Sequence, residues 1–275
     1  MIRFGRSLRF LHLLGFFPPL VALIWQERFA LFTGRSPSVK ERVILGIVTW
    51  LAYTFDGIWD AHKAKGLRAL PQRHRFLKKH QRVFLLASAA LLVLAGILAG
   101  GLSPSHLWAG TISTAAALAY LLLAQAFPRI MRGLIPRELF VGLFFSIAVG
   151  LFTLQDWAHD LPPLLAFALL CTANGVAISL DEREVDLERG DVTLATTHGK
   201  LGDSLSKILH GGLLGAGLAL LLGGVLWKTK PEREAMGESF GLALVCLALV
   251  PYLIRDKTLR PAAYDLALCA PLLVW

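Results

Sequence analysis

The sequence predicts an all-α polytopic membrane protein, with nine transmembrane helices in a single bundle and a central cavity open to the cytoplasmic face. Hydrophobic residues make up 55% of the 275 residues and charged residues 17%, and the mean hydropathy is +0.60. The apolar residues form long runs separated by short polar loops. This pattern is typical of membrane helices, because a helix satisfies its own backbone hydrogen bonds in lipid. We expect one domain covering residues 1–275.

Nine apolar runs approach the roughly 20 residues that a membrane span requires. They occupy residues 10–27, 42–59, 83–100, 106–127, 138–155, 162–180, 205–227, 238–254 and 261–275. The first run follows three arginines and contains Pro18 and Pro19, so a signal peptide is an alternative interpretation. Because no small-residue cleavage site clearly follows, we interpret this run as the first membrane helix.

The positions of the basic residues predict the orientation of the bundle. With the N-terminus in the cytoplasm, 21 of the 28 Lys and Arg residues fall on the cytoplasmic side. The segments that carry them are 1–9, 61–82, 128–137, 181–207 and 255–260. This is the bias of the positive-inside rule, and omitting one helix would invert every later loop. The net charge of +9 is therefore topological, and we expect no nucleic-acid partner.

The three cysteines, Cys171, Cys246 and Cys269, lie inside apolar runs and have no CxxC spacing. We interpret them as small buried residues rather than as a disulfide framework or a metal site. The sequence also has no Ser–His–Asp arrangement and no glycine-rich phosphate loop. Any chemistry must therefore come from another set of polar residues.

Two acidic clusters end the second and sixth predicted helices. Asp56 and Asp60 are four residues apart, so they share one face of a helix. The segment 181–186, with the sequence DEREVD, repeats this spacing in Glu182 and Asp186. Both helices run toward the cytoplasm in the predicted topology, so the two clusters can meet there.

Carboxylates at this spacing repel, and an ionised carboxylate within the membrane costs about 2.5–3.5 kcal/mol or more. The pairs therefore need a compensating cation. Mg²⁺ favours one or two carboxylates together with waters and phosphate oxygens. We expect a Mg²⁺ site, whose candidate ligands are Asp56, Asp60, Asp181, Glu182 and Asp186. The alternative is that each pair only ends a helix as solvated interfacial charge.

Basic residues beside both clusters suit an anionic ligand such as a diphosphate. Lys65 and Arg68 follow the first pair, and Arg183 and Lys200 accompany the second cluster. The alternative is that the whole run after Asp60 only directs topology and binds lipid headgroups. We assign that role to the later part of the run, which comprises Arg73, Arg75, Lys78, Lys79 and Arg82.

This layout resembles the UbiA superfamily of intramembrane prenyltransferases. The first motif of that family, NDxxDxxxD followed by a basic segment, is similar to residues 52–60, which keep the last two aspartates at Asp56 and Asp60. Ala52 and Tyr53 stand where the family has Asn-Asp. The second motif resembles residues 180–195, LDEREVDLERGDVTLA, with Glu in place of one usual Asp. The resemblance covers nearly the whole chain in layout and about forty residues in motif.

The resemblance implies Mg²⁺-dependent transfer of a prenyl group from a prenyl diphosphate to an aromatic or other lipophilic acceptor, with release of pyrophosphate. The allylic C–O bond ionises in a water-poor cavity, and the carbocation alkylates the acceptor. The implied catalytic residues are Asp56, Asp60, Glu182 and Asp186. The implied substrate-binding residues are Tyr53, Lys65, Arg68, Asn174, Arg183 and Lys200.

Several other residues are candidates for the cavity, each with an ordinary structural alternative. Aromatic residues stabilise a cation through their π faces or simply fill the core, and the candidates are Tyr53, Phe55, Trp59 and Phe140. Asn174 orients a ligand or bridges helices. Arg137 and Glu138 reach the cavity or form a helix-end salt bridge. His198 is a base toward the acceptor or a solvated loop residue.

Two other functions fit the same pattern. An intramembrane terpene cyclase would ionise the diphosphate without a separate acceptor. A non-catalytic protein would bind or transport lipid, and the altered first motif would then mark lost chemistry. Transporters more often carry polar residues and broken helices at mid-membrane, whereas the charges here gather at one face, which favours an enzyme. The expected partners are prenyl diphosphate, a lipophilic acceptor and membrane lipid.

Overall fold

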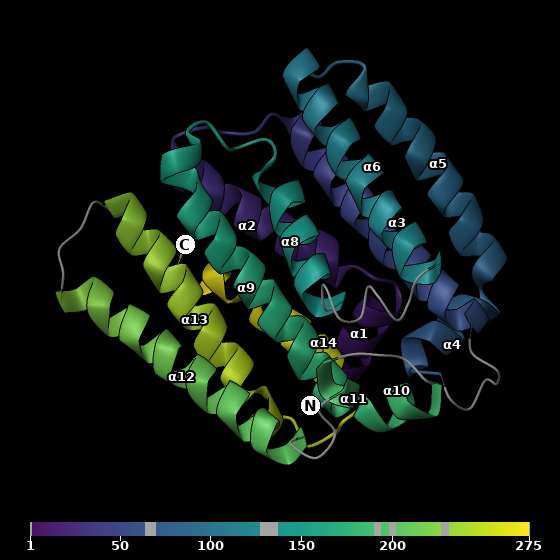
Figure 1. Ribbon diagram of the computed structural model, residues 1–275, viewed down its shortest axis with the longest axis vertical. Helices are drawn as coiled ribbons and strands as arrows, with labels where there is room; N and C mark the ends of the chain where they lie inside the picture. The colour runs from purple at the N-terminus through teal and green to yellow at the C-terminus, as the bar shows by residue number, and fades with distance from the viewer. Residues whose placement is uncertain are drawn as a thin grey trace.

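The computed structural model describes residues 2–63, 70–126, 137–189, 194–197, 202–226 and 231–274. Within these ranges every regular element is a helix, which confirms the all-α prediction (Figure 1). The elements are α1 (Ile2–Leu13), α2 (Phe17–Thr33), α3 (Val39–Lys63), α4 (Gln72–Lys79), α5 (Gln81–Ala99), α6 (Pro104–Ala126), α8 (Arg137–Gly150), α9 (Trp157–Asp181), α10 (Arg183–Arg189), α11 (Leu194–Thr197), α12 (Gly202–Leu226), α13 (Pro231–Leu253), α14 (Arg260–Ala267) and the 3₁₀ helix η2 (Ala270–Val274).

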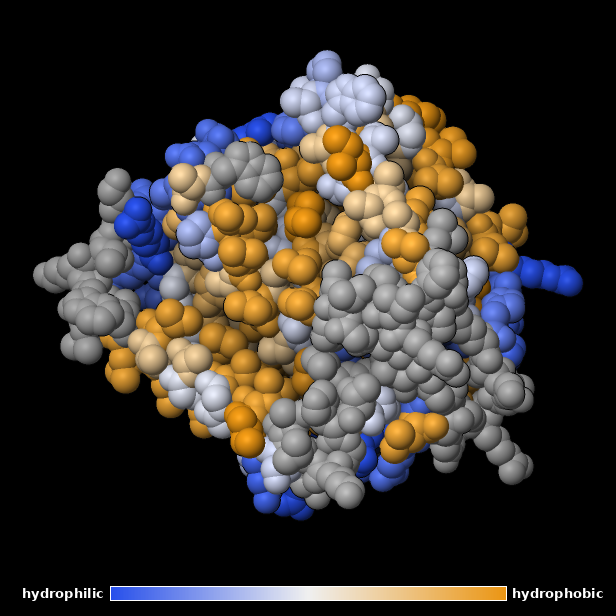
Figure 2. Space-filling model, viewed as in Figure 1, coloured by the Kyte–Doolittle hydropathy of each residue, from blue (hydrophilic) through white to orange (hydrophobic). Residues whose placement is uncertain are grey.

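Among the residues that the structure describes, four helical segments are long and apolar enough to cross a membrane, namely Val39–His62, Gln81–Ala99, Ala158–Asp181 and Pro231–Leu253. A fifth candidate span consists of α1 and α2, which meet at 90°. Figure 2 shows apolar side chains across the middle of one face, with hydrophilic side chains toward its edges. The chain therefore has the helices of a membrane protein, while the predicted number of nine spans is not confirmed.

The first predicted span, residues 10–27, is not one helix. The chain turns at Gly15, whose φ of +74° is the left-handed conformation that glycine adopts most easily. Pro18 and Pro19 lie in the first turn of α2, where a missing backbone N–H costs nothing. α1 consequently leaves the axis of α2 and lies beside α4 and α14.

The last predicted span, residues 261–275, is also interrupted. α14 ends at Ala267 and is followed by the short helix η2. Pro261 lies in the first turn of α14, and Pro271 lies within η2, where it has no N–H to continue an α-helix. The fifth predicted span, 138–155, is shorter than expected because α8 has only 14 residues. The other six runs match α3, α5, α6, α9, α12 and α13.

The core is centred on the indole of Trp25 in α2, which is fully buried. Its ring lies 4.6 Å from that of Phe167 in α9 and 4.7 Å from that of Phe240 in α13. Its Nε1 donates a hydrogen bond of 2.9 Å to the carbonyl of Leu268. This indole is held by close ring contacts and by a hydrogen bond from its N–H group. Such contacts are important in lipid, because the burial of apolar side chains alone does not hold helices together there.

The arrangement brings the C-terminal ends of α3 and α9 and the start of α8 to one end of the bundle (Figure 1). The short helices α1, α4, α10 and α11 lie at this same end. At the opposite end, Ser38 and Glu41 form a capping box at the start of α3. His106 of α6 contacts the same glutamate, with Nδ1 3.2 Å from Oε1, and so ties α6 to α3.

Glycines allow α12 and α13 to pack closely. A Cβ atom on Gly217 would lie 2.8 Å from the carbonyl oxygen of Gly241 and 2.8 Å from Val245 Cγ2. In contrast, a Cβ on Gly215 would have no neighbour within 4 Å. We therefore expect Gly217→Ala to lower the free energy of unfolding by about 1–3 kcal/mol through overpacking.

Gly215→Ala is the matched control and should be neutral or stabilising, because alanine favours the helix by about 0.5–1 kcal/mol. Thermal unfolding in detergent measures both variants. Equal shifts of the two midpoints would contradict the close packing of α12 on α13.

Candidate active site

The first acidic pair lies near the end of α3 and contacts the first residue of α8. Arg137 Nη2 is 3.0 Å from Oδ1 and 2.9 Å from Oδ2 of Asp56, and 3.0 Å from Oδ2 of Asp60. The side chain of Asp60 is 10% exposed and that of Asp56 is 44% exposed. The carboxylates thus converge on one cationic nitrogen, and Arg137 supplies the compensating positive charge that their spacing requires.

The next residue of α8 connects the pair to α9. Glu138 is 5% exposed, and its Oε1 accepts a hydrogen bond of 3.1 Å from Ser179 Oγ. It packs on Gly175, where an added Cβ would lie 3.5 Å from Glu138 Cβ and Cγ. Because Ser179 precedes Asp181 by two residues, the start of α8 joins the helix of the first acidic pair to the helix of the second cluster.

The second cluster is held by its own contacts. Asp181 pairs with Arg260 of α14 at 2.8 Å, and both side chains are 16% exposed. Asp186 in α10 is buried, and Glu182 is the C-cap residue of α9. Arg183 Nε donates to the carbonyl of Ala195 at 3.2 Å, which ties α10 to α11.

The five predicted metal ligands are not gathered into one cage. Across the described ranges, no three His, Cys, Asp or Glu side chains lie close enough together to hold a metal ion. Asp56 and Asp60 do converge on one point, and two carboxylates are sufficient for Mg²⁺ when phosphate oxygens and waters complete its shell. The residues present therefore fit a metal at the first pair.

Tyr53 lies one turn before Asp56 and is half-buried. It stands where the first motif of the UbiA superfamily, which the sequence resembles, has an aspartate.

Arg73 of α4 covers the ring of Tyr53, with Cζ 3.5 Å from the ring centroid. Its Nη2 donates a hydrogen bond of 2.9 Å to the carbonyl of Tyr53. The residue is only 5% exposed, and no carboxylate in the described part of the chain forms an ion pair with it. The expectation that Arg73 binds lipid headgroups is therefore wrong, because its side chain is buried against α3 next to the first acidic pair.

Gly57, which lies between Asp56 and Asp60, is the residue in the sequence that indicates the contact between Arg73 and α3. A Cβ atom on Gly57 would lie 2.7 Å from Arg73 Nη1 and 2.6 Å from Leu77 Cδ1. Only a residue without a side chain allows α4 to approach α3 this closely. Lys78 adds a second contact, because its Nζ donates to the carbonyl of Ala61 at 3.1 Å.

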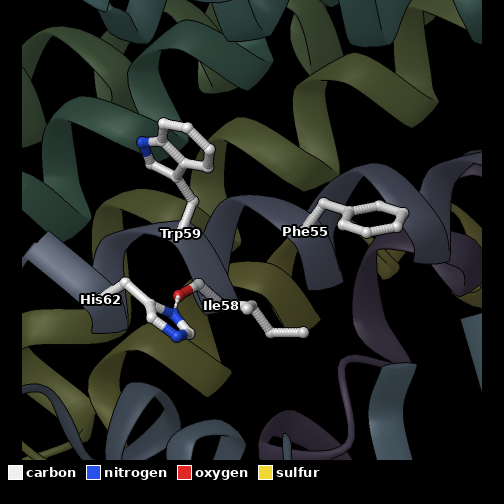
Figure 3. Close-up of a pocket in the computed structure, with 4 residues that line it drawn as sticks. All are labelled: Phe55, Ile58, Trp59 and His62. Atoms are coloured by element: carbon white, nitrogen blue, oxygen red, sulfur yellow. Dashed lines mark hydrogen bonds between the residues drawn. The ribbon is translucent and has the colours of Figure 1, made fainter. Parts of the chain in front are cut away.

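An open pocket of about 450 Å³ lies on α3, and Phe55, Ile58, Trp59 and His62 line it (Figure 3). Phe55 and Trp59 are 47% and 55% exposed. The imidazole of His62 is held through Nδ1, 2.8 Å from the carbonyl of Ile58. Phe140, in contrast, is buried and stacks on Tyr120 at 3.3 Å, which is a packing role.

Asn174 bridges two helices, because its Nδ2 donates a hydrogen bond of 3.2 Å to Asp265 Oδ1 in α14. This contact fits the structural alternative for Asn174, and a role in ligand binding stays a prediction. The predicted contacts Lys65, Arg68 and Lys200, and the loop residue His198, lie outside the described residues.

No family model matches the chain, and neither a curated protein nor a solved structure matches it. The function is therefore inferred from the two motifs and from the contacts of the site.

Proposed function

We propose that the protein is a Mg²⁺-dependent intramembrane prenyltransferase, which moves a prenyl group from a prenyl diphosphate to an aromatic or other lipophilic acceptor and releases pyrophosphate. In this proposal the chain crosses the membrane nine times, with its N-terminus and both acidic clusters on the cytoplasmic side. The observation that carries the proposal is the mixed charge of the site. Two carboxylates converge beside the buried guanidinium of Arg73, which has no carboxylate partner among the described residues.

Arg73 supports an anionic ligand. A guanidinium group buried without a carboxylate at ion-pair distance is costly, and an anion that binds it recovers part of that cost. The planar fork of Arg suits phosphate oxygens, which accept two parallel hydrogen bonds. Nη2 is already used by the carbonyl of Tyr53, while Nε is buried and makes no hydrogen bond. A diphosphate beside Asp56 would therefore find both a cation and a free donor.

The carboxylates support a metal beside that anion. Three oxygens of Asp56 and Asp60 lie within 3.0 Å of Arg137 Nη2, so any cation at that point faces both residues. When bound there, Mg²⁺ would neutralise the diphosphate and stabilise the charge that develops on the leaving group. Arg137 must then leave the carboxylates, and its guanidinium becomes available to the diphosphate oxygens.

The aromatic side chains that neighbour Asp56 and Asp60 in the sequence suit the allylic carbocation that ionisation produces. Phe55 and Trp59 are four residues apart on α3 and therefore share one face of the helix, next to Asp56 and Asp60. Their π faces attract a cation. This pocket is apolar apart from His62, as a prenyl chain requires.

The first prediction tests ionisation directly. Purified protein in detergent or liposomes, incubated with Mg²⁺ and a panel of prenyl diphosphates, should release pyrophosphate. Asp56→Asn and Asp60→Asn should each lower the rate on the order of 100-fold or more, because a metal supplies several kcal/mol of charge stabilisation. Each variant keeps one carboxylate on Arg137, so the fold should persist.

Asp156→Asn is the control, because Asp156 is the N-cap of α9 and asparagine caps a helix equally well. Full activity of both site variants would refute the proposal. Cyclised hydrocarbon without an acceptor would indicate a terpene cyclase, and binding without pyrophosphate release would indicate a non-catalytic lipid-binding protein.

The second prediction concerns Arg73. Arg73→Met should weaken the binding of a non-hydrolysable prenyl diphosphate analogue about 10- to 100-fold, since a hydrogen bond to a charged group contributes about 1.5–3 kcal/mol. Arg73→Lys keeps the charge without the planar fork and should fall between wild type and Arg73→Met. Equilibrium binding at fixed Mg²⁺ measures all three proteins.

Arg75→Met is the control, because it removes the same charge from the same helix at an exposed position. The affinity of this variant for the analogue should stay within about twofold of wild type, since screened surface charges contribute little. Equal losses in Arg73→Met and Arg75→Met would mean that α4 acts only through its overall charge.

A further inference from the structure

A second polar cluster is buried where α1, α9 and α14 meet. The carboxylate of Asp265 accepts the hydrogen bond from Asn174 on Oδ1, and its Oδ2 lies 3.5 Å from His12 Nδ1. The side chains of His12 and Asp265 are 15% and 12% exposed. Asp265 interrupts an apolar run near the C-terminus, and a carboxylate at such a position usually has a function.

The two nitrogens of the His12 ring have different surroundings. Nδ1 is buried and makes no hydrogen bond, and Asp265 Oδ2 lies 3.5 Å from it. Nε2 has no hydrogen-bond partner in the part of the chain that the structure describes. A carboxylate facing Nδ1 favours the tautomer with its proton on that nitrogen, which leaves the lone pair of Nε2 free to accept another proton. Asn174 holds Asp265 from its other side.

The residues that follow His12 at the end of α1 lie beside the candidate active site. Gly15 follows His12 by three residues, and a Cβ there would lie 3.3 Å from Tyr53 Cδ1 and 3.6 Å from Arg73 Nη2. Trp50 Nε1 of α3 donates a hydrogen bond of 2.9 Å to the carbonyl of Leu14. The end of α1 is therefore fixed against α3 about one turn before Asp56.

Arg9, about one turn before His12 on α1, is anchored as well. Arg9 Nη2 lies 3.0 Å from Thr258 Oγ1 and 3.4 Å from Asp256 Oδ2. The hydroxyl and the backbone N–H of Thr258 hydrogen-bond Asp256 and hold the pKa of that exposed carboxyl below its usual value. The contacts of Arg9 and Leu14 therefore hold the chain on both sides of His12.

We propose that His12 is the general base that accepts the proton lost by the acceptor, with Asp265 and Asn174 as positioning residues. The inference rests on the proposed prenyl transfer. The allylic C–O electrons leave with pyrophosphate, and the acceptor forms a new bond to the allylic carbon. The proton of the reacting hydroxyl or ring carbon moves to His12 Nε2, its bonding electrons stay on the acceptor, and Asp265 stabilises the imidazolium that forms.

The test separates ionisation from transfer. Reconstituted enzyme is given Mg²⁺, a prenyl diphosphate and a phenolic acceptor, and pyrophosphate, prenylated product and prenyl alcohol are each quantified. His12→Asn keeps a polar side chain near Asp265 but has no basic nitrogen. It should release pyrophosphate at a rate within about threefold of wild type, because ionisation needs no base. Its product formation should fall about 10²- to 10⁴-fold, with prenyl alcohol formed instead.

Chemical rescue distinguishes a base from a structural contact. Added imidazole should restore part of the transfer in His12→Ala, and Asp265→Asn should lower transfer on the order of 10-fold, since it weakens only the orientation of the base. His159→Ala is the matched control, because its Nδ1 lies 2.8 Å from Asp160 Oδ1 at the other end of the bundle. That variant should transfer at the wild-type rate.

Two results would overturn the proposal in different ways. A parallel loss of pyrophosphate and product in His12→Asn, without imidazole rescue in His12→Ala, would make the His12–Asp265 contact a helix tie only. Absence of pyrophosphate release by the wild-type protein with every donor would remove the proposed function itself, and the inference with it.

Discussion

The ion pair between Arg137 and the two aspartates of α3 is the contact on which the site depends. Asp56 and Asp60 would repel each other at the end of an apolar helix, where ionised carboxylates are costly. One nitrogen of Arg137 lies within 3.0 Å of both. Glu138 follows Arg137 in the sequence and accepts a hydrogen bond from Ser179 of α9. The start of α8 therefore neutralises the first acidic pair through Arg137 and holds α9 through Glu138.

The charged groups of the site differ in exposure. Of the Asp56 side chain 44% is exposed, whereas Arg73 is 5% exposed and lies over the ring of Tyr53. Solvent therefore reaches the first carboxylate directly, while the guanidinium of Arg73 is shielded from it.

The sequence predicted the helical class and most helix positions, because long apolar runs report lipid exposure and length directly. It also placed Asp56 and Asp60 together, since a four-residue spacing fixes one helix face. Arg73 was misassigned because a short basic helix does not reveal which of its cations faces inward, and only Gly57 signalled the contact. Asp265 was missed although an acid in an apolar run is itself a signal, and its partner His12 came from the far end of the chain.

Both terminal runs are interrupted, and these interruptions bring the polar residues together. A continuous helix over residues 10–27 would carry His12 along the axis of α2, whereas the turn at Gly15 bends α1 by 90° onto α14. At the other terminus, α14 begins at Arg260, directly before Pro261, and this first residue pairs with Asp181. The breaks in these two runs therefore bring His12, Asp265 and the cation of the second acidic cluster to the same end of the bundle.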